Sequence, residues 1–129
     1  MRRGGAVAGR TVVDQGGVAM KSKRSKACDI PQRVKARVFE RDEGRCIICG
    51  ATGWGVFPNS HVVKRSHGGL GIEENITTMC VRCHDLFDGT ARRSMMPHVE
   101  CYMKRKYVGW DKSKLIYKKG EDYGKDDAM

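Results

Sequence analysis

Four of the six cysteines form two pairs with the same short spacing. Each pair has the pattern Cys-x-x-Cys, and thirty residues separate the first pair, Cys46 and Cys49, from the second, Cys80 and Cys83. A Cys-x-x-Cys turn places two sulfurs on one side of a tight bend, and two such turns can complete a tetrahedral cage around Zn²⁺, with metal–sulfur bonds of about 2.3 Å. We therefore expect a structural zinc site that closes the fold of a small domain.

Two other interpretations of these thiols stay open. One is redox pairing, although no strand–helix–strand pattern of the thioredoxin kind surrounds either pair. The other is that they are ordinary packing thiols. Cys28 and Cys101 lie outside both pairs, and we expect them to be ordinary buried or surface thiols.

The length of the chain limits what can position such a site. Its 129 residues accommodate one small domain. No apolar run approaches the roughly 20 residues that span a bilayer, and the first twenty residues lack the apolar core of a secretory signal. We therefore expect the protein to be in the cytoplasm. Because disulfides are rare in that compartment, metal binding is the first explanation for six cysteines.

Positive charge is distributed unevenly along the chain, whose formal net charge is +10. Residues 1–26 contain seven basic residues and one acidic residue, and we expect them to form a disordered basic arm. We expect residues 27–119 to form the folded domain and residues 120–129 to form a disordered acidic tail. A basic domain with a basic arm favours nucleic acid as its partner, while a merely solubilising surface is the alternative. Binding to an anionic membrane surface is a third possibility, but the sequence contains no clear basic amphipathic helix that would support it.

The first half of the domain contains one helix signal and two short extended pieces. Asp29 is a candidate N-cap with Pro31 in the first turn, and Val34, Val38 and Phe39 then fall on one helical face. We expect that helix to end over residues 40–44. A tight turn at 46–50 should precede strand pieces at 56–58 and 61–63, separated by a turn at 59–60.

The second half returns to helical character. Residues 66–71 contain three glycines and should form a loop, residues 75–79 are β-prone, and residues 80–88 are helical. A last helix is expected over 94–107, with Pro97 in its first turn, followed by an apolar return at Trp110, Leu115, Ile116 and Tyr117. The expected fold class is α+β.

The segments GRCIICG and NSHVVKRSHGGLGIEENITTMCVRCHDLFD resemble the HNH endonuclease family in its variant with two zinc knuckles. The chain is also similar to small phage-encoded HNH proteins along nearly all of residues 21–119. This resemblance implies a ββα-metal fold with flanking helices, in which a β-hairpin and the following helix hold a catalytic divalent ion, Mg²⁺ or Mn²⁺, in addition to the structural zinc.

The resemblance also implies roles for four residues. His61 matches the general base that takes a proton from water, and Asn75 matches the asparagine that ties the loop and orients this base. His84 matches the metal-binding histidine. Asp88 lies four residues after His84 on the same helical face and matches a further metal ligand. Plainer interpretations stay open for all four: a hydrogen-bonded surface histidine, a turn asparagine, a helix-start histidine and a helix-end aspartate.

One position departs from the family pattern. Ser60 stands where many relatives carry an aspartate or histidine that helps to bind the ion, and a serine hydroxyl is a poor ligand. We therefore expect weak binding of the catalytic metal in the absence of DNA. Lys64 and Arg65 follow the candidate base and could contact a flanking phosphate, with simple solvent exposure as the alternative.

The expected function is metal-dependent hydrolysis of phosphodiester bonds in double-stranded DNA. The resemblance to phage proteins places this activity in the cytoplasm of a bacterial host, in DNA processing or packaging, with packaging proteins as further partners. The alternative function is a non-catalytic zinc-knuckle module that binds nucleic acid.

Overall fold

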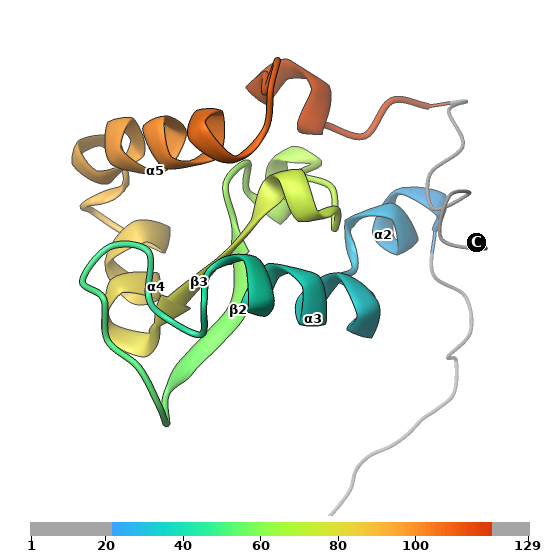
Figure 1. Ribbon diagram of the computed structural model, residues 1–129. Coiled ribbons are helices and arrows are strands. Elements are labelled where there is room, and N and C mark those ends of the chain that lie inside the picture. The colour runs from blue at the N-terminus through green and yellow to red at the C-terminus, as the bar shows by residue number, and fades with distance from the viewer. Residues whose placement is uncertain (1–21, 120–129) are drawn as a thin grey trace, which may run out of the picture.

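The computed structural model describes residues 22–119, which fold as a small α+β domain (Figure 1). The fold class expected from the sequence is confirmed at this level. The helices and strands, in chain order, are α2 (Lys23–Cys28), α3 (Gln32–Arg41), β2 (Val56–His61), β3 (Ile76–Cys80), α4 (Val81–Asp88) and α5 (Arg92–Lys106). Within residues 22–119, none of the helices has the length and apolar character needed to cross a membrane.

Strands β2 and β3 form an antiparallel hairpin with one irregularity. Val56 pairs with Cys80 and His61 pairs with Ile76, but the register shifts by one residue between Phe57 and Ser60. Such a shift is a β-bulge, which accommodates Pro58 because proline has no N–H for the ladder. The turn expected at 59–60 is therefore wrong, and one continuous strand takes its place.

Helix α4 begins where β3 ends. Cys80 is the last residue of β3 and also the N-cap of α4, where its sulfur accepts a hydrogen bond from the backbone N–H of Cys83. Helix α4 packs against the hairpin and α5 packs against α4 (Figure 1), around a core of buried side chains. This core contains Cys46, Val62, Met79, Cys83, Phe87, Val99 and Met103.

Helix α3 covers the hairpin through a second, smaller cluster. Val34 and Val38 lie one turn apart and pack with Ile76 of β3. Phe39, which we expected on the same face, leaves 40 % of its surface exposed, because it lies about 100° further round the helix than Val38. The helix also begins later than expected, with Pro31 rather than Asp29 at its N-cap.

Asp29 instead follows α2, a helix that the sequence did not predict. Ser22 caps α2 by accepting a hydrogen bond from the Ser25 N–H, and Cys28 at its end is buried. Residues 23–26, which we assigned to the basic arm, thus form most of this helix. The remaining parts of the predicted arm and tail, 1–21 and 120–129, lie outside the described residues.

The glycine-rich loop after β2 is held between α2 and the C-terminal segment. A Cβ at Gly69 would lie 1.7 Å from the Val63 carbonyl oxygen, and one at Gly71 would lie 1.8 Å from that of Asp29. Only glycine fits such close backbone approaches. The Leu70 N–H donates to the Leu115 carbonyl, and Gly69 forms a bridge with Ile116. Leu115 of the predicted apolar return is buried, whereas Ile116 is 37 % exposed.

Helix α5 differs from the prediction at its start. It begins at Arg92, so Pro97 lies beyond the first turn that we expected to contain it. Val99 and Met103 of this helix are fully buried, as their spacing predicts.

Candidate functional site

The four cysteines of the two Cys-x-x-Cys pairs converge on one point. Their sulfurs all lie within 4.8 Å of one another, and they are the one group of three or more ligand-type side chains found in residues 22–119. A tetrahedral zinc site with bonds of about 2.3 Å has sulfur–sulfur edges of about 3.8 Å. The Cys49 and Cys80 sulfurs are 3.7 Å apart, so this set of donors fits a metal ion well.

The backbone builds both knuckles. In the first, the Gly50 N–H donates to the Cys46 carbonyl with Gly50 at φ +81°, and the Cys46 N–H donates to Ala51. The Ile47 N–H donates to the Thr78 carbonyl and fastens this knuckle to β3. The second knuckle is the junction of β3 and α4. Cys28 is buried and Cys101 is exposed, and neither joins the cluster, as expected.

The thiols of this cluster have unequal pKa values. Burial opposes ionisation of Cys46, but backbone hydrogen bonds from Cys49, Cys80 and Ile48 outweigh it and lower the Cys46 pKa from 9.0 to about 7. Burial, with hydrogen bonds to the neighbouring sulfurs, raises the pKa of Cys83. Zinc binding replaces the protons of such thiols, which couples metal affinity to pH.

His61 is the last residue of β2, and a backbone carbonyl orients its ring. Its Nε2 atom lies 3.1 Å from the carbonyl oxygen of Cys28 at the end of α2. A carbonyl oxygen can only accept, so Nε2 must carry the proton in this hydrogen bond. In the neutral ring the other nitrogen, Nδ1, is then unprotonated and available to accept a proton.

The surroundings of His61 lower its pKa below 6.5. Burial is the largest cause, and the positive charge of Arg65 and the nearby His84 act in the same direction. The Cys28 carbonyl and the Asp88 carboxylate oppose the shift. His61 therefore favours its neutral form, and its ring lies within electrostatic reach of two side chains of α4.

His84 and Asp88 form a pair on α4. The His84 Nε2 and an Asp88 carboxylate oxygen are 3.1 Å apart, and the two side chains are 27 % and 54 % exposed. Adjacent ligands of an octahedral ion at about 2.1 Å lie about 3 Å apart. The pair therefore has the spacing and accessibility to hold one edge of a divalent-ion site, with the remaining positions open to water or a substrate.

Asn75 is fully buried and anchors the loop that follows His61. Its Oδ1 atom accepts a hydrogen bond of 2.8 Å from the Val63 N–H, and its Nδ2 donates to the Val63 and Leu70 carbonyls. All polar atoms of the side chain are used within the loop. Asn75 thus holds the backbone of the loop that follows His61.

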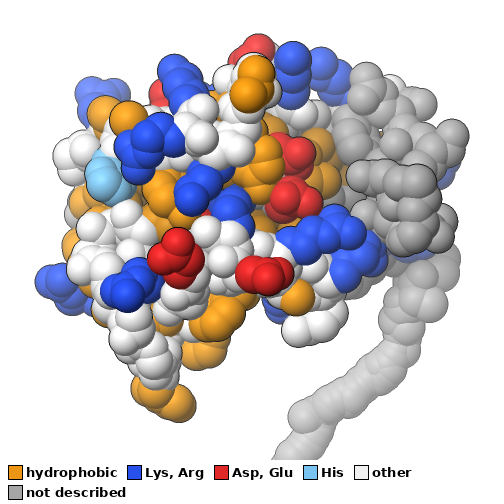
Figure 2. Space-filling model, in the orientation of Figure 1, with side chains coloured by type: hydrophobic (Ala, Val, Ile, Leu, Met, Phe, Trp, Pro, Cys, Tyr) orange, Lys and Arg blue, Asp and Glu red, His pale blue; other side chains and the backbone are white. Residues whose placement is uncertain are grey.

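Ser60, Lys64 and Arg65 differ in their burial and in their hydrogen-bond partners. Ser60 is fully buried, and its hydroxyl has no hydrogen-bond partner among residues 22–119. Arg65 forms an ion pair of 2.7 Å with Asp29 and hydrogen bonds with Ser25, although 43 % of its side chain remains exposed. Lys64 is half-buried. Figure 2 shows Lys and Arg side chains spread over the visible face of the domain.

Two residues near the site could not be recognised from the sequence. The Cys28 carbonyl is 33 positions from His61, and nothing in the local pattern connects them. Arg92, at the start of α5, donates to the carbonyl of Val62 directly after His61 and to that of Phe87. An arginine at a helix start carries no sequence signal for such a contact.

No protein-family model, no curated protein and no solved structure matches this chain. The residues and distances described above are therefore the basis on which a function can be assigned.

Proposed function

We propose that this protein is a metal-dependent endonuclease of the HNH type, which hydrolyses phosphodiester bonds in DNA. The observation that carries the proposal is the arrangement of His61. Its Nε2–H is committed to the Cys28 carbonyl, its Nδ1 is left as the proton acceptor, and its pKa is lowered. A neutral imidazole with one oriented acceptor suits a general base that activates water near neutral pH.

The α4 pair supports the same proposal. His84 and Asp88 would hold a divalent cation, Mg²⁺ or Mn²⁺, and this ion would neutralise charge on the scissile phosphate. Strand β2, strand β3 and α4 follow one another in the order that the HNH resemblance implies. The structural zinc at the four cysteines would fix α4 against the hairpin and so position His84 relative to His61.

Basic side chains around His61 would contribute to binding. Lys64 and Arg65 would contact phosphates beside the scissile bond, Arg65 with the donors that its pairing with Asp29 leaves exposed. Double-stranded DNA as substrate, phage packaging proteins as partners and the cytoplasm of a bacterial host are parts of this proposal that derive from the resemblance.

One observation favours a second function. Ser60 is buried and offers no ligand, so the described side chains supply two ligands for a catalytic ion. A zinc-knuckle module that binds nucleic acid without cutting it would need neither this ion nor an oriented His61.

A plasmid-nicking assay separates the two functions. Zinc-loaded wild-type protein should convert supercoiled plasmid to the nicked form with Mg²⁺ or Mn²⁺, and His61→Ala should reduce the rate at least 100-fold, the low end of the range for general acid–base catalysis. His67→Ala, which removes an exposed histidine six residues later, is the matched control and should retain activity. Equal nicking by His61→Ala and wild type, or no nicking with either metal, would overturn the nuclease proposal.

A further inference from the structure

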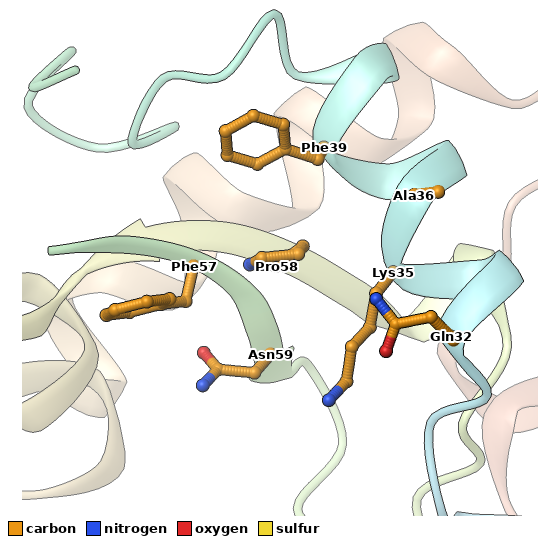
Figure 3. Close-up of a pocket in the computed structure, with 7 residues that line it drawn as sticks. All are labelled: Gln32, Lys35, Ala36, Phe39, Phe57, Pro58 and Asn59. Carbon is orange, nitrogen blue, oxygen red and sulfur yellow. The ribbon is translucent and has the colours of Figure 1, made fainter. Parts of the chain in front are cut away.

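A groove between α3 and β2 lies outside the site described above (Figure 3). Its volume is about 360 Å³, which is within the usual size of small-molecule sites. Helix α3 forms one wall and the bulged part of β2 forms the other. The residues that line it are Gln32, Lys35, Ala36, Phe39, Phe57, Pro58 and Asn59.

Two aromatic rings border this groove and are only partly covered. Phe39 of α3 is 40 % exposed and Phe57 of β2 is 44 % exposed. The position of the Phe39 ring depends on Gly44, because a Cβ there would lie 3.3 Å from two of the ring carbons. The protein therefore presents two flat apolar surfaces to the solvent, one of them backed by a glycine.

The other side chains of the groove are polar or basic. Lys35 extends from α3 towards Asn59 of β2 (Figure 3), and Gln32 lies at the same end. The two amides offer both donors and acceptors, and the lysine offers a positive charge. Flat apolar surfaces beside a cation and hydrogen-bonding amides match the chemistry of a nucleobase and its phosphate.

The groove lies next to the proposed catalytic base. Asn59 precedes His61 by two positions in β2, a distance of roughly 7 Å along a strand. The groove and the proposed base therefore share strand β2.

We propose that this groove binds an unpaired nucleobase of a DNA strand, stacked on Phe39 and Phe57, while Lys35 contacts a phosphate of the same strand. The proposal rests on the proposed endonuclease function for its choice of DNA. It makes double-stranded DNA with an unpaired segment next to the cut a better substrate than fully paired duplex.

Binding to labelled oligonucleotides tests the groove independently of cleavage. The zinc-loaded protein, without added Mg²⁺ or Mn²⁺, should bind a single-stranded oligonucleotide, and Phe57→Ala should weaken this binding roughly 5- to 100-fold, as for loss of one base-stacking ring. Phe57→Trp should restore it. Val108→Ala, which removes exposed apolar surface outside the groove, should leave the affinity unchanged. The same affinity for Phe57→Ala and wild type would overturn the proposal.

The contact of Lys35 with a phosphate can be tested through the salt dependence of the affinity. Lys35→Ala should lower the slope of log affinity against log salt by about 0.7, as expected for one lost contact to a single-stranded phosphate, and Lys35→Arg should keep it. Lys104→Ala on α5 is the charge-matched control. Equal slopes for Lys35→Ala and Lys104→Ala would overturn the assignment of Lys35.

Photocrosslinking locates the base directly. A single-stranded oligonucleotide with one 5-iodouracil should crosslink to the peptide that contains Phe39 or Phe57, and crosslinks only to other segments would contradict the proposal. The two proposals also fail separately. Nicking without an effect of Phe57→Ala on binding overturns the groove alone, whereas Phe57-dependent binding without nicking overturns the endonuclease alone.

Discussion

The side-chain amide of Asn75 forms two hydrogen bonds with the backbone of Val63, a residue twelve positions earlier. Its Oδ1 accepts from the Val63 N–H at 2.8 Å, and its Nδ2 donates to the Val63 carbonyl at 3.3 Å. The amide thus bonds both the N–H and the carbonyl of Val63, as the backbone of a neighbouring strand does within a sheet. It holds the backbone two residues beyond His61 in a single position.

Replacement of Asn75 should destabilise the domain. Asn75→Ala removes the partners of a partly buried N–H at Val63 and of a buried carbonyl at Leu70, and we expect the free energy of unfolding to fall by about 2–4 kcal/mol. Urea denaturation measures this change. Asn59→Ala, at an exposed asparagine, is the matched control and should change it by less than about 0.5 kcal/mol. Equal effects of the two variants would exclude the anchoring role.

Loss of one zinc-knuckle cysteine should unfold the protein. Cys83→Ser removes a buried ligand of the four-cysteine set, so we expect bound zinc to fall from one ion per chain to none and the cooperative thermal transition to disappear. Elemental analysis and circular dichroism measure the two effects. Cys101→Ser, at the exposed thiol outside the cluster, should change neither. A folded protein that persists after complete removal of zinc would instead favour packing or redox thiols.

His61 should titrate below its ordinary pKa. Burial is the main cause, so the NMR titration of the His61 ring should have its midpoint below about 6.5. Because the pKa in the folded state is lower than in the unfolded state, the contribution of neutral His61 to stability is fully present above pH 6.5. It is lost as the pH falls through the folded-state pKa.

Asp88→Asn provides a control for that titration. The Asp88 carboxylate raises the His61 pKa, so its removal should lower the midpoint further. The stability profile of His61→Ala should lack the acid-dependent loss. A midpoint at or above 6.5 in the wild type would contradict the burial of this ring in solution.

The second metal should bind weakly without DNA. In the proposed site His84 and Asp88 would supply two protein ligands and would leave most of the coordination shell to water and substrate phosphate, as is usual for Mg²⁺ sites that act on phosphates. Calorimetric titration of the zinc-loaded protein with Mn²⁺ should therefore show no tight binding until an uncleavable DNA analogue is added. Tight, DNA-independent binding of a second ion would refute this prediction.

Ser60→Ala should be tolerated. The Ser60 hydroxyl is buried without a hydrogen-bond partner among the described residues, so its removal should leave stability unchanged or increase it by up to about 1 kcal/mol. Thermal denaturation measures the change in stability, and the nicking assay measures whether activity is retained. Ser22→Ala removes the hydroxyl that caps α2 and should destabilise the protein by about 0.5–2 kcal/mol. A loss of nicking with retained stability would identify Ser60 as part of the catalytic site.

Local patterns predicted the elements that local interactions specify. The Cys-x-x-Cys spacing is a short-range signal, and it correctly predicted that four sulfurs would converge. Residues 80–88 were expected to be helical, and the N-cap contact of that helix, from the Cys83 N–H to the Cys80 sulfur, spans only three residues. The burial of Val34 and Val38 followed from their separation by one helical turn.

Contacts between distant segments were not predictable in this way. The bulge at Pro58 depends on the register of β3, and the exposure of Phe39 depends on where α3 meets the hairpin. Helix α2 is capped by Ser22 but has only six residues, and it was missed because its contact with the loop, from the Gly71 N–H to the Ala27 carbonyl, joins distant segments.

By itself, the sequence determined the four cysteines that cluster, the α+β class, and the types and spacing of His61, His84 and Asp88. Only the tertiary structure decided which nitrogen of neutral His61 carries the proton, because this choice depends on a carbonyl of Cys28 brought from 33 positions away. It also decided that Ser60 is buried and that a groove lies beside the strand of His61. Spacing along a chain specifies which groups are available, whereas their burial and partners arise only when separate elements pack together.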